Sequence, residues 1–175
     1  MKKNLIKIAL FSACIIGLQS CESRKVIVNR EVESSTDGQL LLGTQTRSQF
    51  QKAPFSDWFD PEYANYQLDQ DAISGLKKEK LKSSQITVFV GTWCGDSHRE
   101  FPRLMKILDE INFPENRLTI IAVNRKKESP NGEEAIFNIQ RVPTIIVRKY
   151  GKEVGRIIEY PKSGFLERDL LDIIK

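Results

Sequence analysis

The chain has 175 residues, enough for one ordinary domain with additional segments, and 40% hydrophobic with 29% charged residues is typical of a globular protein. The formal net charge of +4 includes three lysines near the start, Lys2, Lys3 and Lys7, and the rest of the chain is nearly neutral. Composition and charge therefore exclude a disordered chain and give no reason to expect a nucleic acid as partner.

The first segment, MKKNLIKIALFSACIIGLQSC, predicts an export signal over residues 1–20. It has a basic start and an apolar run that is too short for a membrane-spanning helix. Its ending, LQSC, resembles the bacterial lipobox, which implies that Cys21 becomes the lipidated first residue of the mature protein. Acyl chains would then anchor the protein on the periplasmic side of the cytoplasmic membrane or on the outer membrane. An ordinary signal peptide, with Cys21 as a free thiol, is the alternative.

The next segment, residues 21–46, is mostly polar, and we interpret it as a flexible tether between the membrane and the domain. Two short runs within it, KVIV and QLLL, have the composition of strands, but no neighbouring sequence suggests a pairing partner. Residues 47–84 predict a helical extension rich in aromatic residues. We expect this aromatic stripe to cover the main sheet rather than to bind a ligand.

From residue 85 onward the pattern alternates between strands and helices. Continuous β-branched runs are typical of strands buried on both faces, and apolar residues at helical spacing are typical of amphipathic helices. In chain order we expect a strand at 85–91, a helix at 97–111, a strand at 117–124, a short helix within 130–139, a hairpin at 144–160 with Gly151 in its turn, and a helix at 163–174. This order predicts an α/β fold with a central mixed β-sheet flanked by helices.

Cys94 follows the first buried strand and comes directly before a helix. Unpaired backbone N–H groups and the positive end of the helix macrodipole favour a thiolate at such a place. Asp96 opposes this through its like charge, but a carboxylate that points into water is screened. We therefore expect an accessible and mildly activated thiol. His98, the only histidine, is a candidate for added positive charge or proton transfer, and an exposed helix residue without a role is the alternative.

The number of cysteines also singles out Cys94. Cys14 would leave with the signal and Cys21 would be acylated, so Cys94 would be the only free thiol of the mature protein. An exported chain with one free cysteine cannot form internal disulfides. One histidine and one free cysteine are also too few soft ligands for a zinc or copper site, so we expect no metal and no cofactor.

Three features in the same order resemble the thioredoxin superfamily. WCGDS, at 93–97, stands where the family has Trp-Cys-Gly-Pro-Cys, and Pro102 falls at the family's helix-kink proline. RVPT, with Pro143, stands where the family has its cis-proline loop beside the active site. The resemblance covers residues 85–175 and implies a thioredoxin-like domain over 47–175. The motifs also look like those of exported or lipid-anchored thioredoxin-like proteins of Bacteroidota.

This resemblance implies roles for particular residues. Cys94 would be the attacking thiol, and its active-site neighbours are Trp93, Gly95, Asp96 and His98. Pro143 would be cis, and the backbone of Val142 would pair with the substrate as an added strand.

Two departures from the family pattern concern the same step, the release of the substrate from the attacking cysteine. Ser97 occupies the position of the resolving cysteine, and Val88 occupies the place of a buried aspartate that assists proton transfer at that second cysteine. Cys94 could attack a disulfide and form a mixed disulfide, but the Ser97 hydroxyl can only donate a hydrogen bond and cannot expel the substrate. Release would need an external thiol.

The expected function is therefore a monothiol oxidoreductase or isomerase that acts on protein or low-molecular-weight disulfides. A redox-inactive binding or scaffold lipoprotein that keeps the thioredoxin-like fold is the alternative. A thiol peroxidase is disfavoured, because the hydroxyl residue and the arginine that such enzymes use near the attacking cysteine are not recognisably placed.

Overall fold

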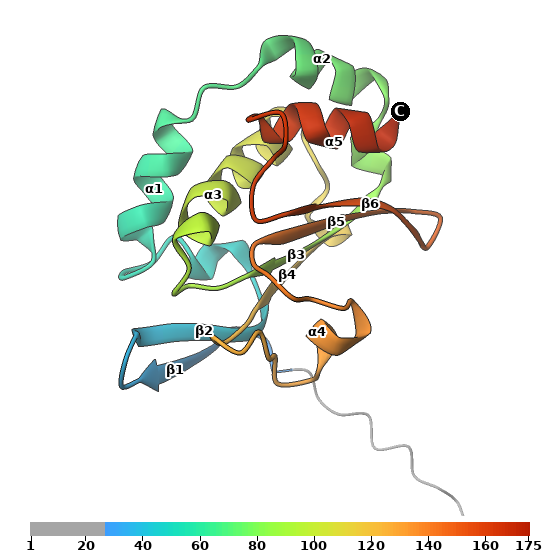
Figure 1. Ribbon diagram of the computed structural model, residues 1–175. Coiled ribbons are helices and arrows are strands. Elements are labelled where there is room, and N and C mark those ends of the chain that lie inside the picture. Colours follow the sequence, from blue (N-terminus) through green and yellow to red (C-terminus); the bar gives the residue numbers. More distant parts are fainter. Residues whose placement is uncertain (1–26) are drawn as a thin grey trace, which may run out of the picture.

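One mixed β-sheet organises the computed structural model, which describes residues 27–175 (Figure 1). The strands described there are β1 (Arg30–Ser34), β2 (Gly38–Gln45), β3 (Gln85–Val90), β4 (Leu118–Ala122), β5 (Thr144–Lys149) and β6 (Lys152–Ile158). Their order across the sheet is β1-β2-β4-β3-β5-β6. β3 and β4 are parallel, and every other neighbouring pair is antiparallel. The predicted export signal and Cys21 lie outside the described residues.

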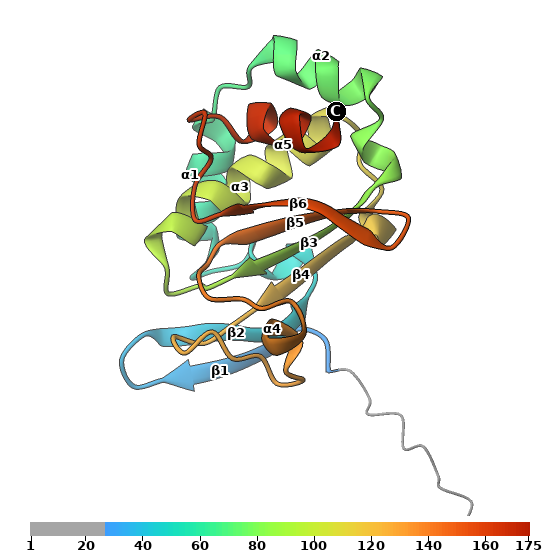
Figure 2. The same cartoon turned by 45° about the vertical axis from the view of Figure 1, so that its right-hand side comes forward.

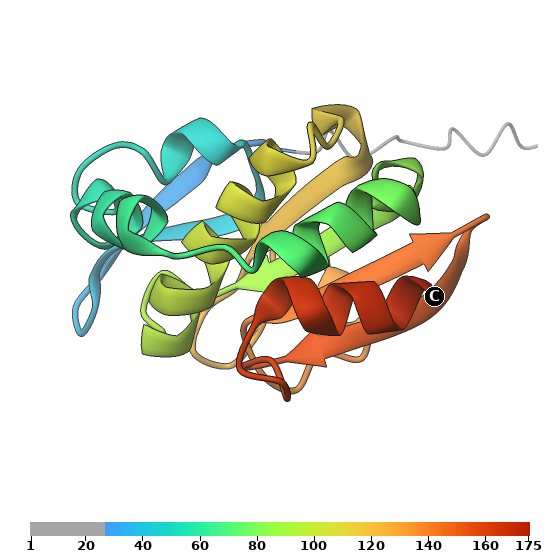
Figure 3. The same ribbon diagram turned by 90° about the horizontal axis from the view of Figure 1, so that it is seen from above.

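Helices cover the two faces of the sheet unequally. They are α1 (Ser56–Asn65), α2 (Gln70–Lys78), α3 (Gly95–Glu110), α4 (Glu133–Ile136) and α5 (Leu166–Ile174). α1, α2, α3 and α5 lie on one face, and the short α4 lies on the other (Figures 1 and 2). Seen from above, α2 and α5 run side by side (Figure 3). Within the described part of the chain no helix is long and apolar enough to cross a membrane.

The predicted fold class is confirmed. The segment from β3 to α5 contains the parallel pair β3 and β4 joined through α3, then the antiparallel hairpin of β5 and β6, then a closing helix. β3 lies between β4 and β5 in the sheet. Pro102 lies inside α3. The hairpin turns at Tyr150 and Gly151, which both have positive φ, 52° and 76°, as a two-residue type I′ turn requires.

The predicted flexible tether over residues 21–46 is wrong for residues 30–45, which belong to the sheet. β1 and β2 form a hairpin, and β2 pairs with β4 in antiparallel register, with Gln45 opposite Ile120. Leu40 and Leu41, from the QLLL run, are only 5% and 0% exposed. The strand partner was not apparent from the sequence because β4 lies far downstream in the chain.

The apolar residues form two clusters, one on each face of the sheet. The larger cluster fills the space between the sheet and α1, α2, α3 and α5. The smaller one, on the α4 face, consists of Phe89, Ile121, Val123, Ile139, Val142 and Ile146. Trp93, Cys94 and Phe137 pack against this smaller cluster. The predicted reactive cysteine therefore lies beside the thinly covered face.

The aromatic extension is helical, as predicted, and packs on α3, which in turn lies on the sheet. The ring of Phe101 on α3 is 4.5 Å from Phe50 and 5.8 Å from Phe59, between centroids. The Tyr66 hydroxyl donates to the fully buried Glu167 carboxylate of α5 at 2.7 Å. Burial, followed by this hydrogen bond to a carboxylate, raises the pKa of Tyr66 above its ordinary value. The extension is thus part of the packed domain.

If the β1–β2 hairpin belongs to the domain, Leu41→Ala should lower the free energy of unfolding by about 2 to 5 kcal/mol, because it leaves a cavity in the core. Leu42→Ala, at a half-buried position of the same strand, is the matched control and should cost less. Chemical denaturation of the two variants measures the difference. Equal and negligible losses would show that this segment is the tether that the sequence first suggested.

Candidate functional site

The register of the central strands places Cys94 next to the proline loop. Phe89, near the end of β3, lies opposite Thr144, the first residue of β5. The loop that follows β3 and the residues that precede β5 therefore meet at the same edge of the sheet. The Cys94 thiol donates a hydrogen bond to the backbone carbonyl of Val142 at 3.3 Å.

The peptide bond between Val142 and Pro143 is cis, as the resemblance implies. A second cis bond, between Ala53 and Pro54, lies in the N-terminal extension. Cys94 is a free, partly exposed cysteine at the N-cap of α3. Its sulfur is accordingly neither sealed in the interior nor remote from the proline loop.

Backbone and indole hydrogen bonds hold the loop in front of α3. The Cys94 N–H donates to the Gly91 carbonyl at 2.9 Å, and the Trp93 indole N–H donates to the Val123 carbonyl, just after β4, at 2.8 Å. A Cβ atom on Gly91 would lie 2.7 Å from the Trp93 ring, so only glycine allows the indole to pack there. Next to Cys94, Gly95 has open space around it.

Ser97, at the position of the family's resolving cysteine, supports this loop. Its side chain is buried, and its hydroxyl oxygen accepts the N–H of Gly91 at 3.1 Å. Within residues 27–175 it makes no hydrogen bond to the Cys94 sulfur, so the expected donation to a thiolate is not made in this state. Val88 is fully buried in β3 and supplies no acid beneath the site.

His98 is held by two contacts rather than exposed. Its ring stacks on Trp58 of α1, with centroids 4.3 Å apart and 13° between the planes. Its Nε2 atom lies 2.8 Å from the Thr92 carbonyl, and because a carbonyl oxygen only accepts, Nε2 carries the hydrogen. His98 therefore positions the loop before Cys94, and no contact with the sulfur supports the predicted proton transfer.

The β1–β2 hairpin and the aromatic extension both contact the site through Thr92, which sequence reasoning did not single out. The Leu41 N–H, from β2, donates to the Thr92 hydroxyl oxygen at 3.3 Å. His98, which stacks on Trp58, binds the Thr92 carbonyl. The hairpin and the extension thus hold the residue two positions before Cys94. No sequence signal could have paired these residues, since the contacts join distant parts of the chain.

Charged groups flank the motif on two sides. Asp96 is partly exposed and pairs with Arg99 at 2.8 Å, in agreement with the expectation that it faces water. On the other side, the guanidinium of Arg125 lies 5.2 Å from the Trp93 ring centroid and binds the Asp37 carboxylate of the β1–β2 turn. This cation beside the motif was also missed, because Arg125 stands in a polar loop without a pattern.

The comparisons with known proteins concern the fold. No protein-family model matches the sequence. Among solved structures, the chain is similar to mitochondrial thioredoxin 3 of Saccharomyces cerevisiae in its oxidised form, with 22% identity, 57% of this chain and 89% of that chain covered, and a TM-score of 0.38.

Two further solved structures have comparable similarity. One is a protein of unknown function from Pseudomonas aeruginosa, with 16% identity, 70% of this chain and 96% of that chain covered, and a TM-score of 0.39. The other is oxidised thioredoxin O2 of Arabidopsis thaliana, with 18% identity, 51% and 72% covered, and a TM-score of 0.34. The thioredoxin-like fold of this chain is given by its own strand order and strand directions.

The packing of Trp93 on Gly91 can be tested with a pair of glycine substitutions. Gly91→Ala should lower the free energy of unfolding by about 1 to 3 kcal/mol and shift the tryptophan fluorescence, because the indole must move. Gly95→Ala should leave stability unchanged or raise it by up to about 1 kcal/mol, since the added methyl meets open space and alanine favours a helix. Similar, small effects of both substitutions would contradict the packing.

The ion pair between Asp37 and Arg125 predicts a pH dependence. Hydrogen bonds from Arg125 lower the pKa of Asp37 below its ordinary value of 3.8. A carboxyl group with a lowered folded-state pKa adds stability above its unfolded pKa and loses it as the pH falls through the folded one. Wild type should therefore be more stable than Asp37→Asn at about pH 7, and the difference should shrink below about pH 3.8.

Denaturant unfolding of both proteins over this pH range measures the difference. Asp60→Asn, which changes an exposed carboxylate of α1, is the control and should show little difference at any pH. A difference between wild type and Asp37→Asn that grows in acid would contradict the ion pair.

Proposed function

We propose that this chain is an exported thioredoxin-like protein that carries out thiol–disulfide exchange through Cys94 alone. One observation carries the proposal: a partly exposed thiol at the N-terminus of α3 contacts the carbonyl of Val142 beside a cis proline, while position 97 holds a serine. The substrates are disulfides of proteins or of low-molecular-weight compounds.

The reaction has two steps. The Cys94 thiolate attacks one sulfur of a substrate disulfide, so that a disulfide forms between Cys94 and the substrate and the other substrate sulfur leaves as a thiolate. The sulfur lies at the start of α3, where the first backbone N–H groups lack helical partners. The Val142 backbone would pair with an extended substrate segment, and its contact with the Cys94 thiol supports this role.

An external thiol completes the exchange. Its thiolate attacks the substrate sulfur of the mixed disulfide, which forms a new disulfide with the substrate and returns Cys94 as a thiolate. The Ser97 hydroxyl, which binds the Gly91 N–H, cannot perform this step. Among residues 27–175, Cys94 is the only cysteine, so no second sulfur competes with the external thiol.

We further propose that the protein acts on the periplasmic side of a bacterial membrane, anchored through lipid on Cys21. The basic start, the apolar run and the LQSC ending of residues 1–21 support this location. Lipid chains hold a protein at a membrane without a transmembrane helix. An exported compartment also allows substrate disulfides to persist.

A binding protein without redox turnover is the second candidate, and two observations favour it. Ser97 has a structural hydrogen bond and Val88 is packed in the core, so neither supports the release of a substrate. Such a protein would retain its partner under reducing conditions in a Cys94→Ser variant. The exchange proposal predicts instead that covalent adducts with the substrate disappear in the Cys94→Ser variant.

Restoring the missing sulfur tests the proposal directly. Without an added thiol, the mixed disulfide of the wild type with a model disulfide substrate should persist. In Ser97→Cys the new thiolate can attack the Cys94 sulfur and expel the substrate as a thiolate. Because this attack is intramolecular, the adduct should decay at least about tenfold faster than that of the wild type. Non-reducing gels and mass spectrometry follow the adduct.

Ser97→Ala serves as the matched control, and its adduct should be as long-lived as that of the wild type. A wild-type adduct that decays without added thiol as fast as the Ser97→Cys adduct would contradict an unresolved monothiol site.

A further inference from the structure

The first strand begins at the edge of the sheet opposite to Cys94. β1 starts at Arg30, which lies opposite Leu42 near the end of β2, whereas Cys94 follows the end of β3. Because β2 is antiparallel to β4 and β4 is parallel to β3, the start of β1 and the starts of β3 and β4 share one edge. The turn of the β5–β6 hairpin also lies there, since Arg148 is opposite Gln85. We call this the N-terminal edge and the other one the Cys94 edge.

Two views of the molecule show the same separation. The β5–β6 turn and the C-terminus lie at one end, and the β1–β2 turn and the start of α3 lie at the other (Figures 1 and 3). Along β3 the two edges are about 20 Å apart, because its six residues rise about 3.3 Å each. The Cys94 sulfur is therefore well away from the place where β1 begins.

Exposed bases outnumber exposed acids at the N-terminal edge. Four segments meet there, residues 77–85, 109–118, 148–153 and 172–175. Five of their exposed bases form no ion pair with another described residue: Lys78, Lys80, Lys82, Arg117 and Lys152. Two exposed acids, Glu79 and Glu115, are likewise unpaired. The other acids of these segments are bound in ion pairs: Asp109 to Arg47, Glu110 to Lys77, Glu153 to Arg156 and Asp172 to Lys175.

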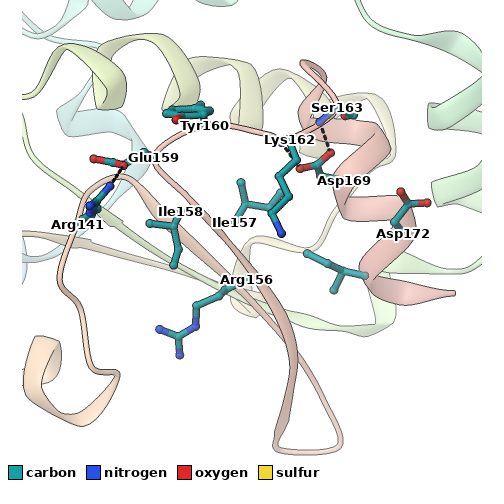
Figure 4. A pocket seen from close by; sticks show the side chains of 11 residues that line it. Arg141, Arg156, Ile157, Ile158, Glu159, Tyr160, Lys162, Ser163, Asp169 and Asp172 are labelled. Carbon is teal, nitrogen blue, oxygen red and sulfur yellow. Dashed lines mark hydrogen bonds and ion pairs between the residues drawn. The ribbon is translucent and has the colours of Figure 1, made fainter.

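The Cys94 edge carries less unpaired charge. Three arginines there are bound to carboxylates: Arg99 to Asp96, Arg125 to Asp37, and Arg141 to Glu159 in the groove beside the proline loop (Figure 4). In residues 91–99, 123–128, 140–143 and 159–163, the exposed charges without an ion pair are Lys126, Lys162 and Glu128. The excess is one base at this edge and three at the N-terminal edge.

Apolar and aromatic side chains are also exposed at the N-terminal edge. Ile27 and Val28, just before β1, are 63% and 48% exposed, and Tyr150 in the β5–β6 turn is fully exposed. The Asn29 N–H donates to the Thr44 carbonyl at 2.9 Å and so holds this stretch against β2. Apolar side chains and tyrosine rings beside basic residues suit the boundary between lipid headgroups and water.

The distance from Cys21 to the N-terminal edge is short. Eight residues, 22–29, separate Cys21 from Arg30. An extended chain spans at most about 3.6 Å per residue, so a lipid on Cys21 would keep this edge within about 30 Å of the membrane. Attachment raises the effective concentration of the edge at the headgroups. An excess of three bases would then favour contact with an anionic surface roughly a hundredfold.

We propose that the N-terminal edge lies on the anionic phospholipid surface of the membrane that holds the lipid on Cys21, and that Cys94 consequently faces the aqueous compartment. This inference rests on the lipid anchor proposed above. It narrows the substrates to disulfides outside the bilayer, because Cys94 is held about 20 Å or more from the headgroups.

Fluorescence quenching on vesicles tests this orientation. The lipidated mature protein is reconstituted on vesicles of phosphatidylcholine, alone or mixed with anionic phosphatidylglycerol, with a contact quencher on the headgroups. A fluorophore is attached either to Cys94 or, in a Cys94→Ala background, to the thiol introduced by Ser83→Cys. Ser83 is exposed at the N-terminal edge, directly before the start of β3.

On anionic vesicles the label at position 83 should be quenched at least about threefold more than the label on Cys94, because the basic edge selects one orientation. Phosphatidylcholine alone, or salt at about 0.5 M, should reduce this difference, since the exposed charges then lack a partner or are screened. Lys80→Glu with Lys82→Glu should also reduce it, because the excess of bases is lost. Lys126→Glu with Lys162→Glu, which changes two exposed lysines of the Cys94 edge, is the matched control and should preserve it.

Equal quenching of the two labels on anionic vesicles would overturn the orientation and leave the anchor standing. A difference that is as large on phosphatidylcholine alone, or that survives in Lys80→Glu with Lys82→Glu, would also overturn it. Mass spectrometry of the mature protein tests the anchor separately. If Cys21 carries no acyl chains, the proposed anchor fails and the orientation fails with it, whereas thiol–disulfide exchange by Cys94 in solution is untouched.

Discussion

The pairing of β3 with β5 is the constraint on which the site depends. Because Phe89 lies opposite Thr144, the loop that ends in Cys94 and the residues before β5 must meet at one edge of the sheet. The sulfur then lies 3.3 Å from the Val142 carbonyl, beside the cis proline and at the start of α3. The pairing of β5 with β6, in which Thr144 lies opposite Ile158, brings Glu159 to the Pro143 carbonyl. The positions of Cys94 and of the proline loop are therefore consequences of one strand arrangement.

Under the proposed function, the neighbours of the sulfur suit only the first half of an exchange reaction. Ser97 stabilises the loop through the Gly91 N–H, Val88 fills the core, and His98 binds the Thr92 carbonyl. The β1–β2 hairpin and the aromatic extension also converge on Thr92. These contacts hold the Cys94 loop in place, and under the proposed function another molecule performs the step that releases the substrate.

Local patterns were enough to predict β3, α3, the hairpin of β5 and β6 and the position of Cys94, since each depends on neighbours in the chain. Contacts between distant segments were not predictable. β2 looked like part of a tether because its partner β4 is far away in sequence, and the stack of Trp58 on His98 joins two helices without a shared motif. Arg125 stands in a polar loop, so only the folded chain shows that it lies on Trp93.

The number of substrate thiols that one protein molecule releases tests the central claim most directly. The full chain is mixed with an excess of a disulfide substrate without any other thiol, and the leaving thiol is counted against the Cys94→Ala blank. The account predicts a burst of about one equivalent, then a stop, and further release only when an external thiol is added. Continued release without that thiol, or no release above the blank, would contradict it.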